Sequence, residues 1–530
     1  MGMNKRTVLD ASRELLRELG LTTVFGNPGT TEVPFLTDWP DDFDYVLGLQ
    51  ESAVVAMADA YAQATRRAVL VNLHSAGGVG HGLGSLYTAY RNRTPLIVVA
   101  GQQNRALLPH DPFLGAMDAT EFPKPYVKWS IEPATAEDVP AALSRAYHVA
   151  TQAPSGPVFV SVPADDWTVT TERPVISRPR IRGFAPDPEA IDELVAALDK
   201  SERPAIVVGG AVDQDGAVVE TVALAERLNA AVWVAPMSFR CSFPEDHPLF
   251  QGFLDPERGA VSDRLAQHDL VVVLGAPAFT YHVDRGRDDA RMPPLFIISD
   301  DEQNLARAFE GTGIRATPKL GVRALLNVVD QSSRPAPAPL QRPAKPSGDK
   351  LTADFVYSTL ADLLPGNAIV VEEAPSHRGF LHDHLPITQT DTGFLTIASG
   401  ALGYGVPGTV GAALACPDRK VIGVIGDGSS MYGIQALWTA ARQDVPVTIL
   451  ILDNSEYAAV RILGDAIGGE KIPGTQLGGI DFAALAASMG CQSVTITEPS
   501  GLAPGLTAAL DEKRPTLVHI RVAASDRTIY

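Results

Sequence analysis

The sequence has few cysteines and no long apolar run. Its three cysteines, Cys241, Cys416 and Cys491, lie far apart in a chain of 530 residues. Their odd number and wide spacing support neither a disulfide framework nor a CxxC metal site, so a reducing compartment is favoured. No apolar stretch approaches the ~18 residues of a membrane span, and the N-terminal residues run directly into an amphipathic helix pattern. We therefore expect a cytoplasmic protein that is neither exported nor inserted in a membrane.

An excess of basic residues is missing as well. Asp and Glu number 62 against 43 Lys and Arg, which gives a formal net charge of −19. A polyanion of this kind is repelled by nucleic acid and by anionic membranes unless a local basic patch compensates, and the sequence has no obvious patch. We expect a small-molecule partner, with no nucleic acid and no membrane.

The chain is rich in apolar core material, arranged in alternating strand and helix patterns. Hydrophobic residues make up 45% and charged residues 20%, the mixture of a soluble globular protein. Short runs of Val, Ile and Leu between longer helical patterns are typical of buried parallel strands. The predicted strands are residues 68–73, 95–101, 156–162, 204–210, 270–275, 367–371, 420–426, 445–452, 493–496 and 516–522.

Two proline-rich stretches divide these patterns. Residues 335–346 contain five prolines, and residues 173–188 replace periodic apolar residues with proline and arginine, so both predict connectors. A chain of this length is expected to form about two to four domains of roughly 100 to 200 residues. The prediction is an α/β fold with three tandem doubly wound parallel-sheet domains. Their predicted bounds are residues 1–180, 181–342 and 343–530.

The most specific local pattern is an apolar strand that ends in Gly426, Asp427 and Gly428 and enters a helical pattern running to about Arg442. In an open parallel sheet, ligands bind at the carboxyl ends of the strands, and the N–H groups at the next helix start suit a phosphate. The two glycines would let the backbone approach such a group closely. An ordinary strand-to-helix turn can also read Gly-Asp-Gly, so the pattern alone leaves that alternative open.

A second predicted strand ends in Asp453 and Asn454, which adds oxygen ligands at the same sheet edge. Mg²⁺ takes one or two such oxygens and completes its shell with phosphate oxygens and water. The two motifs together resemble the metal- and diphosphate-binding motif of the thiamine diphosphate enzymes. The resemblance implies Mg²⁺ or Ca²⁺ on Asp427, on Asn454 and on the backbone carbonyl of Glu456. Asp453 departs from the commoner asparagine and adds a negative charge.

A glutamate in the first third of the chain completes the cofactor pattern. Thiamine diphosphate supplies the electron-sink chemistry, while the protein holds it and polarises its pyrimidine ring. Residues 49–53, Leu-Gln-Glu-Ser-Ala, resemble the segment that carries the family's pyrimidine-binding glutamate, which implies this role for Glu51. A glutamate in the first turn of a helix also favours the helix dipole, and that is the alternative interpretation.

Longer matches identify the chain with the benzoylformate decarboxylase family of 2-keto acid decarboxylases. They comprise residues 24–30 (Val-Phe-Gly-Asn-Pro-Gly-Thr), 72–78 (Asn-Leu-His-Ser-Ala-Gly-Gly), 100–103, 127–130, 233–236 and 437–440, so nearly the whole chain is covered. The resemblance implies non-oxidative decarboxylation of a benzoylformate-like 2-keto acid to an aldehyde and CO₂. It also implies a homodimer of active-site pairs, with a homotetramer as the expected total.

Two histidines and a threonine carry the implied chemistry. Decarboxylation leaves a carbanion-like enamine that must be protonated, and histidine suits proton transfer near neutral pH. The resemblance places His74 from the first domain and His282 from the middle domain in this role, although each alone is more often a structural histidine. Thr30 would bind the substrate carboxylate in place of the usual serine. His81, His377, His382 and His384 have no assigned role and are too irregularly spaced to form a metal cluster.

The remaining implied residues surround the cofactor and the substrate side chain. Gly400 would offer a backbone carbonyl to the cofactor, and Leu402 would form the wedge beneath it. The cofactor set is Glu51, Gly400, Leu402, Gly426, Asp427, Gly428, Ser429, Asn454 and Tyr457. The pocket set is Thr30, Thr396, Ala459, Val460 and Leu463. Thr396 and Leu463 stand where aryl-selective relatives have aromatic rings, so we expect a broadened pocket, and Pro375 replaces a hydroxyl residue near the cofactor.

Two other functions remain open at this point. A carboligase of the acetolactate synthase type shares the cofactor site but usually also binds a flavin in its middle domain, where Gly209, Gly210 and Ala211 are too weak a fingerprint. A non-catalytic cofactor-binding homologue is the second alternative. The paired histidines favour protonation over carboligation, and the presence of Glu51 favours an enzyme.

Overall fold

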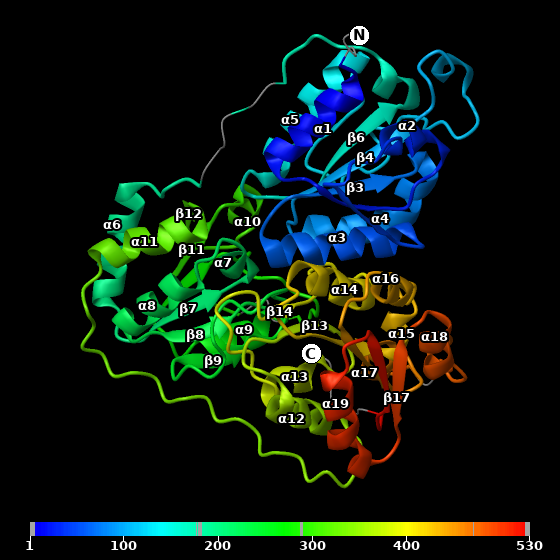
Figure 1. The fold of residues 1–530 in the computed structure, drawn as a ribbon. Helices are drawn as coiled ribbons and strands as arrows, with labels where there is room; N and C mark the ends of the chain where they lie inside the picture. The colour runs from blue at the N-terminus through cyan, green and yellow to red at the C-terminus, as the bar shows by residue number, and fades with distance from the viewer. Residues whose placement is uncertain (1–5, 176–177, 179–182, 287–289, 470, 525–530) are drawn as a thin grey trace.

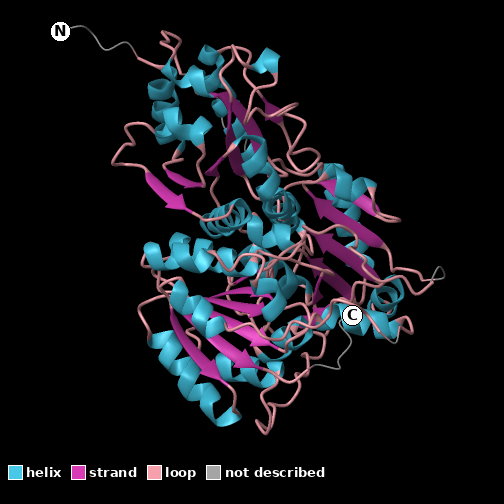
Figure 2. Ribbon diagram, turned by 90° about the vertical axis from the view of Figure 1, so that its right-hand side faces the viewer, coloured by secondary structure: helices cyan, strands magenta, loops and turns pink. Residues whose placement is uncertain are grey.

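The computed structural model describes residues 6–175, 178, 183–286, 290–469 and 471–524. Within these residues the chain forms three six-stranded sheets, each between layers of helices (Figures 1 and 2). Neighbouring strands pair in parallel in all three sheets. The predicted architecture of three doubly wound α/β domains is therefore confirmed. None of the described helices has both the length and the apolar character needed to cross a membrane.

The first sheet has the strand order β2-β1-β3-β4-β6-β5. The chain winds outward from β1 on one side and from β3 on the other, so the crevice between their carboxyl ends is a topological switch point, where ligands bind in such sheets. The strands are β1 (Thr23–Gly26), β2 (Asp44–Leu47), β3 (Val69–Leu73), β4 (Leu96–Gln102), β5 (Ser130–Ile131) and β6 (Val158–Pro163). The helices are α1 (Val8–Leu19), α2 (Val33–Leu36), α3 (Glu51–Thr65), α4 (Ser75–Arg91) and α5 (Val139–Thr151), with 3₁₀ turns η1 (Thr30–Glu32), η2 (Leu108–His110), η3 (Ala136–Asp138) and η4 (Ala164–Thr168).

The middle sheet has the order β12-β11-β10-β7-β8-β9, with its switch point between β7 and β10. Its strands are β7 (Pro204–Val208), β8 (Ala231–Val234), β9 (Phe250–Phe253), β10 (Leu270–Leu274), β11 (Leu295–Ser299) and β12 (Thr312–Arg315). The helices are α6 (Pro188–Lys200), α7 (Gly210–Gln214), α8 (Val218–Leu228), α9 (Arg258–Leu265), α10 (Glu302–Ala306) and α11 (Pro318–Val328).

The third sheet has the order β14-β13-β15-β16-β18-β17, with its switch point between β13 and β15. Its strands are β13 (Ile369–Glu373), β14 (Phe394–Leu395), β15 (Val421–Gly426), β16 (Thr448–Asp453), β17 (Gln492–Ile496) and β18 (Thr516–Arg521). The helices are α12 (Ala353–Leu363), α13 (Arg378–His384), α14 (Gly405–Ala415), α15 (Asp427–Ser430), α16 (Ala436–Arg442), α17 (Ala458–Ala466), α18 (Phe482–Ser488) and α19 (Leu502–Asp511), with the turn η5 (Pro499–Gly501).

The ten predicted strands correspond to β3, β4, β6, β7, β10, β13, β15, β16, β17 and β18. The expectation of one continuous helix from Asp427 to about Arg442 is wrong. Helix α15 ends at Ser430, and a tight turn precedes α16. The reason lies at Gly433, where an added Cβ would stand only 2.7 Å from the Pro407 ring, so the chain turns closely against α14 there. The predicted division at residues 180/181 falls outside the described residues, and the domain bounds stay a prediction.

The first and third domains are packed together through α3 and α14, which lie side by side in Figure 1. Both helices are rich in small residues, and their buried side chains belong to one hydrophobic core. The helix backbones touch at Gly411, where an added Cβ would lie 2.0 Å from the carbonyl oxygen of Met57. This contact positions the start of α3 and the start of α14 relative to each other.

A buried arginine joins all three domains. Arg240 of the middle domain forms an ion pair with Asp213 of the same domain. Its guanidinium also donates to Gln63 of the first domain and to Thr392 of the third, each over 3.0 Å. This buried network contributes to the relative placement of the three sheets.

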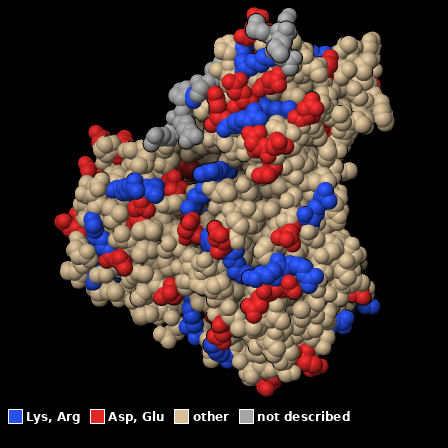
Figure 3. Space-filling model, in the orientation of Figure 1, with Lys and Arg blue, Asp and Glu red and all other residues tan. Residues whose placement is uncertain are grey.

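On the outer surface, charges of both signs are interspersed on the face drawn in Figure 3.

Candidate active site

His74 directly follows β3, beside the switch point of the first sheet, and is held by Glu32. Its Nδ1 lies 2.9 Å from Oε2 of Glu32 and 3.0 Å from Oγ1 of Thr31. Glu32 is 1% exposed and also accepts the backbone N–H groups of Gly29 and Gly101, each over 2.8 Å. A carboxylate at Nδ1 favours the tautomer with the proton on that nitrogen, which leaves Nε2 free to exchange a proton with a substrate.

The backbone after His74 is strained. Ser75 has φ +39°, in the left-handed region that non-glycine residues rarely adopt. Its hydroxyl donates to the carbonyl of Leu114 over 2.8 Å, so the loop after β4 is tied to the start of α4. Strained backbone of this kind clusters at functional sites. Thr30 begins η1, in the loop that follows the carboxyl end of β1, and it is exposed.

Glu51 is the first residue of α3, as predicted, and Gln50 caps the helix by accepting the N–H groups of Ser52 and Ala53. The Glu51 side chain is 13% exposed, and its Oε2 lies 3.1 Å from Nδ1 of His81. Oε1 faces Gly78, where an added Cβ would stand 3.2 Å away. Glu51 and His74 thus come from the same sheet edge, although their approach to the third domain's site stays a prediction.

Asp427 begins α15 at the carboxyl end of β15, the edge predicted to bind diphosphate and metal. It is 4% exposed, and its Oδ1 accepts the N–H of Gly428 over 2.9 Å. Its Oδ2 is buried and has no hydrogen-bond partner among the described residues. Burial raises the pKa of Asp427, and the neighbouring Asp453 raises that pKa further. A buried, unpartnered carboxylate oxygen fits a cation ligand, because leaving it alone costs free energy.

Asn454 lies beside this carboxylate on the neighbouring strand end. β15 and β16 are paired up to Gly426 and Leu452, so both motifs reach the same edge. Oδ1 of Asn454 accepts the N–H of Glu456 over 3.1 Å. The Glu456 carboxylate is bound by Arg461, so its side chain is occupied and only its backbone carbonyl fits the predicted ligand role.

The carboxylate of Asp453 is hydrogen-bonded to a histidine that the sequence did not reveal. Nε2 of His519, on β18, lies 2.7 Å from Oδ2 of Asp453, and both residues are buried. This hydrogen bond lowers the pKa of Asp453. Oδ1 of Asp453 accepts both the N–H and the hydroxyl of Ser455, a residue with φ +58°. The pair fixes the turn that presents Asn454.

Gly400 and Leu402 lie on a loop whose ends are held by buried polar groups. Glu373, at the end of β13, accepts the N–H groups of Gly403 and Gly405, each over 2.7 Å. On the other side, Asn92 of the first domain accepts the N–H of Ala398 over 2.9 Å. Gly400 itself has φ +75° and open space where a Cβ would stand, so glycine suits the conformation.

The predicted pocket residues separate into an exposed and a buried group. Val460 and Leu463 lie on α17 and are 49% and 40% exposed. Thr396 is 1% exposed instead, and its hydroxyl lies between Arg378 and Glu372 at 2.7 and 2.8 Å. Ala459 is partly buried on the same helix as Leu463. Val460 and Leu463 are therefore exposed on α17 whereas Thr396 is buried, and the pocket roles of all three stay predictions.

The tyrosine and serine predicted beside the diphosphate are close to Gly428. An added Cβ at Gly428 would lie 2.3 Å from the Tyr457 ring, so glycine is needed for this approach. Ser429 is 5% exposed in the same short helix. His282 is exposed on a loop of the middle domain, and its backbone N–H donates to Pro256 over 2.8 Å. The predicted role of His282 in proton transfer stays a prediction.

The three domains match three known family models. Residues 6–122 match the thiamine pyrophosphate enzyme N-terminal TPP binding domain, residues 191–325 the central domain, and residues 374–520 the C-terminal TPP binding domain. Benzoylformate decarboxylase from Pseudomonas aeruginosa is 41% identical, with 97% of this chain and 98% of that protein covered. The chain belongs to the thiamine pyrophosphate enzyme family.

Solved structures of this family superpose over nearly the full length. A Rhodococcus jostii thiamine diphosphate-dependent 4-hydroxybenzoylformate decarboxylase has a TM-score of 0.93 at 39% identity, covering 98% of this chain and all of that one. Benzoylformate decarboxylase from Polynucleobacter necessarius has a TM-score of 0.96 at 37% identity, covering 99% and 100%. Acetolactate synthases are more distant, and the large subunit from Haemophilus influenzae is 25% identical over 99% of this chain and 96% of its own.

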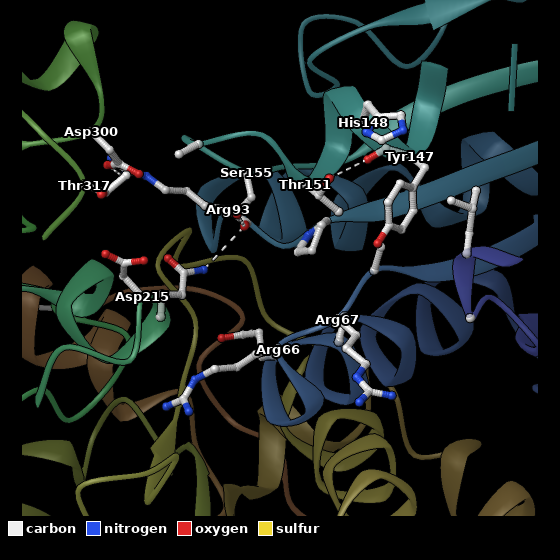
Figure 4. A pocket seen from close by; sticks show the side chains of 18 of the residues that line it. Arg66, Arg67, Arg93, Tyr147, His148, Thr151, Ser155, Asp215, Asp300 and Thr317 are labelled. Atoms are coloured by element: carbon white, nitrogen blue, oxygen red, sulfur yellow. Dashed lines mark hydrogen bonds and ion pairs between the residues drawn. The ribbon is translucent and has the colours of Figure 1, made fainter. Parts of the chain in front are cut away.

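The thiamine pyrophosphate enzyme fold also encloses cavities away from these residues. One of about 680 Å³ lies between the first and middle domains (Figure 4). Two of its arginines are paired with acids across the domain boundary, Arg66 with Asp213 and Arg93 with Asp300. None of the predicted cofactor residues lines it, so this cavity belongs to the domain junction.

Sequence reasoning missed four residues that contact predicted site residues or their loops. Glu32 contacts His74, His81 contacts Glu51, Glu373 accepts a hydrogen bond from the loop after Gly400, and His519 contacts Asp453. Glu32 accepts the backbone N–H of Gly29 over 2.8 Å, but glycine has no side chain to complete a capping box, so Glu32 carried no capping signal in the sequence. The other three depend on contacts between distant segments and left no local signal.

Proposed function

We propose that the chain is a thiamine diphosphate-dependent decarboxylase that converts a benzoylformate-like 2-keto acid to an aldehyde and CO₂. The observation that carries the proposal is His74 held by buried Glu32 on the sheet edge that also presents Glu51. The match to two TPP binding domains and the 41% identity to a benzoylformate decarboxylase support it.

The cofactor residues have separate tasks in this proposal. When bound, thiamine diphosphate supplies a carbon nucleophile and an electron sink. Asp427, Asn454 and the Glu456 carbonyl would hold Mg²⁺ or Ca²⁺, and the unpartnered Asp427 Oδ2 supports a cation there. Gly426, Gly428, Ser429 and Tyr457 would hold the diphosphate, and Gly400 and Leu402 would contact the cofactor rings.

The catalytic side chains move protons and bind the substrate. Glu51 would exchange a proton with the pyrimidine ring through Oε1. His74 would deliver a proton from Nε2, because Nδ1 is engaged by Glu32. Thr30 would donate its hydroxyl to the substrate carboxylate, and His282 would assist from the middle domain. The exposed face of α17, with Ala459, Val460 and Leu463, would contact the substrate side chain.

We further infer that the active unit is at least a homodimer and that the whole assembly is a homotetramer in the cytoplasm. In the described chain Glu51 pairs with His81 of its own domain, and no hydrogen bond joins it to Asp427. A second copy supplying the other half of each site would resolve this separation. Sedimentation of the active protein tests the inference, and a fully active monomer would refute it.

A carboligase of the acetolactate synthase type is the second candidate, since such enzymes share the fold. The higher identity to a benzoylformate decarboxylase, 41% against 25% for an acetolactate synthase large subunit, favours the decarboxylase. Product analysis with pyruvate separates the two candidates, because a synthase forms a hydroxy-keto acid and a decarboxylase forms an aldehyde.

A further inference from the structure

The carboxylate of Glu51 has one oxygen occupied and one left open. Oε2 lies 3.1 Å from Nδ1 of His81. Oε1 faces Gly78, a residue without a side chain, whose added Cβ would stand 3.2 Å away. An ionised carboxylate only accepts hydrogen bonds, so a donor on Oε2 fixes the plane of the group and leaves Oε1 for a second partner.

His81 is placed for this contact by the same helix that follows His74. His74 is the N-terminal cap of α4, and His81 lies about two turns further along it, on the same face. The α3 helix meets this face at Glu51. One helix therefore carries both the proposed proton donor and the group that contacts the proposed cofactor-activating acid.

We propose that His81 is a positioning residue that orients the Glu51 carboxylate, so that Oε1 is presented to the pyrimidine ring of thiamine diphosphate. The inference rests on the proposed role of Glu51. An imidazole hydrogen bond to a carboxylate is charge-assisted and directional. The His81 side chain is 67% exposed, and exposed ion pairs add little to folding stability. We therefore expect the contact to affect the orientation of the Glu51 carboxylate and not the stability of the fold.

The test compares His81→Leu, which removes the donor, with His81→Asn, whose amide nitrogen can replace Nδ1. His247→Asn is the matched control, because His247 makes a similar contact with Glu226 in the middle domain, 3.3 Å long. Three quantities are measured on the full-length protein: the melting temperature, the affinity for thiamine diphosphate with Mg²⁺, and the exchange rate of the thiazolium C2 proton by quenched-flow NMR.

We expect His81→Leu to slow C2 proton exchange about ten- to a hundredfold, the range for one hydrogen bond to a charged group. Cofactor affinity and melting temperature stay near the wild-type values, and His81→Asn recovers most of the exchange rate. Wild-type exchange in His81→Leu overturns the inference, as does a parallel loss of melting temperature and cofactor affinity. Wild-type exchange in Glu51→Gln overturns the proposed function itself, so the two failures are distinguishable.

Discussion

Nδ1 of His74 lies 2.9 Å from the buried Oε2 of Glu32, and this contact decides which nitrogen of the imidazole can serve chemistry. The carboxylate is itself fixed by two backbone N–H groups, from Gly29 and Gly101. The orientation of the histidine is therefore built into the sheet edge before any substrate arrives.

Substitution of Glu32 by Gln should lower kcat/KM by about ten- to a hundredfold, because the amide holds the imidazole less firmly and favours no single tautomer. The check is a double-mutant cycle with His74→Ala. If Glu32 acts through His74, the double variant is no slower than His74→Ala alone. Additive losses would show that Glu32 acts independently of His74.

The close contact of α3 with α14 predicts a steric effect at Gly411. Gly411→Ala would place a methyl group 2.0 Å from the Met57 carbonyl oxygen, so the helices must separate. We expect a loss of about 1–3 kcal/mol or more in the free energy of unfolding, measured by denaturant titration. Gly84→Ala, in the exposed part of α4 with no atom within 4 Å of the new Cβ, is the control and should gain about 0.5–1 kcal/mol. Equal effects at both positions would contradict the packing argument.

Much of the fold was accessible from the sequence, because strands buried on both faces have a distinctive apolar signature. β15 and β16 were predicted with their polar ends, which is why Asp427 and Asn454 could be placed at one edge. The break after Ser430 was missed, since it depends on the approach of Gly433 to Pro407 across the structure. Short strands such as β5 and β14 carry too few residues for a periodic pattern.

The site was predictable where function requires a particular side chain and unpredictable where it requires a neighbour. Glu51 and His74 stand in recognisable local segments. His519 lies far along the chain from Asp453 and meets it only because β16 and β18 are paired. The contacts of Thr396 likewise come from the fold, because Arg378 and Glu372 enclose its hydroxyl, and its place in the substrate pocket stays a prediction.

His377 predicts an acid-dependent loss of stability. It is 2% exposed, neither ring nitrogen has a hydrogen-bond partner among the described residues, and burial lowers its pKa to about 4. The unfolded chain therefore takes up a proton near pH 6.5 that the folded chain resists, so stability conferred by neutral His377 is lost as pH falls from about 6.5 towards 4. His377→Leu should flatten this part of the profile, measured as the free energy of unfolding against pH. An unchanged slope would contradict the buried neutral state.

The exposed aliphatic face of α17 predicts broad substrate selection. Val460 and Leu463 are exposed on α17 and are aliphatic, so they offer no ring to stack against a substrate phenyl group. An aromatic pair of that kind is worth about 0.5–1.5 kcal/mol. We expect comparable kcat/KM for benzoylformate and for branched or extended aliphatic 2-keto acids, with Leu463→Phe shifting preference towards benzoylformate. A wild-type preference for benzoylformate of about a hundredfold, or about 2.7 kcal/mol, would refute the broadened pocket.

The central claim is tested most directly by incubating the purified protein with thiamine diphosphate, Mg²⁺ and a panel of aryl and aliphatic 2-keto acids, while CO₂ and aldehyde are both quantified. The parallel sample is Glu51→Gln, which should bind the cofactor yet turn over far more slowly. We expect equal amounts of CO₂ and aldehyde from at least one aryl 2-keto acid, in a reaction that requires the cofactor. Absence of product from every acid, or CO₂ released with a hydroxy-keto acid in place of the aldehyde, would contradict the proposed decarboxylase activity.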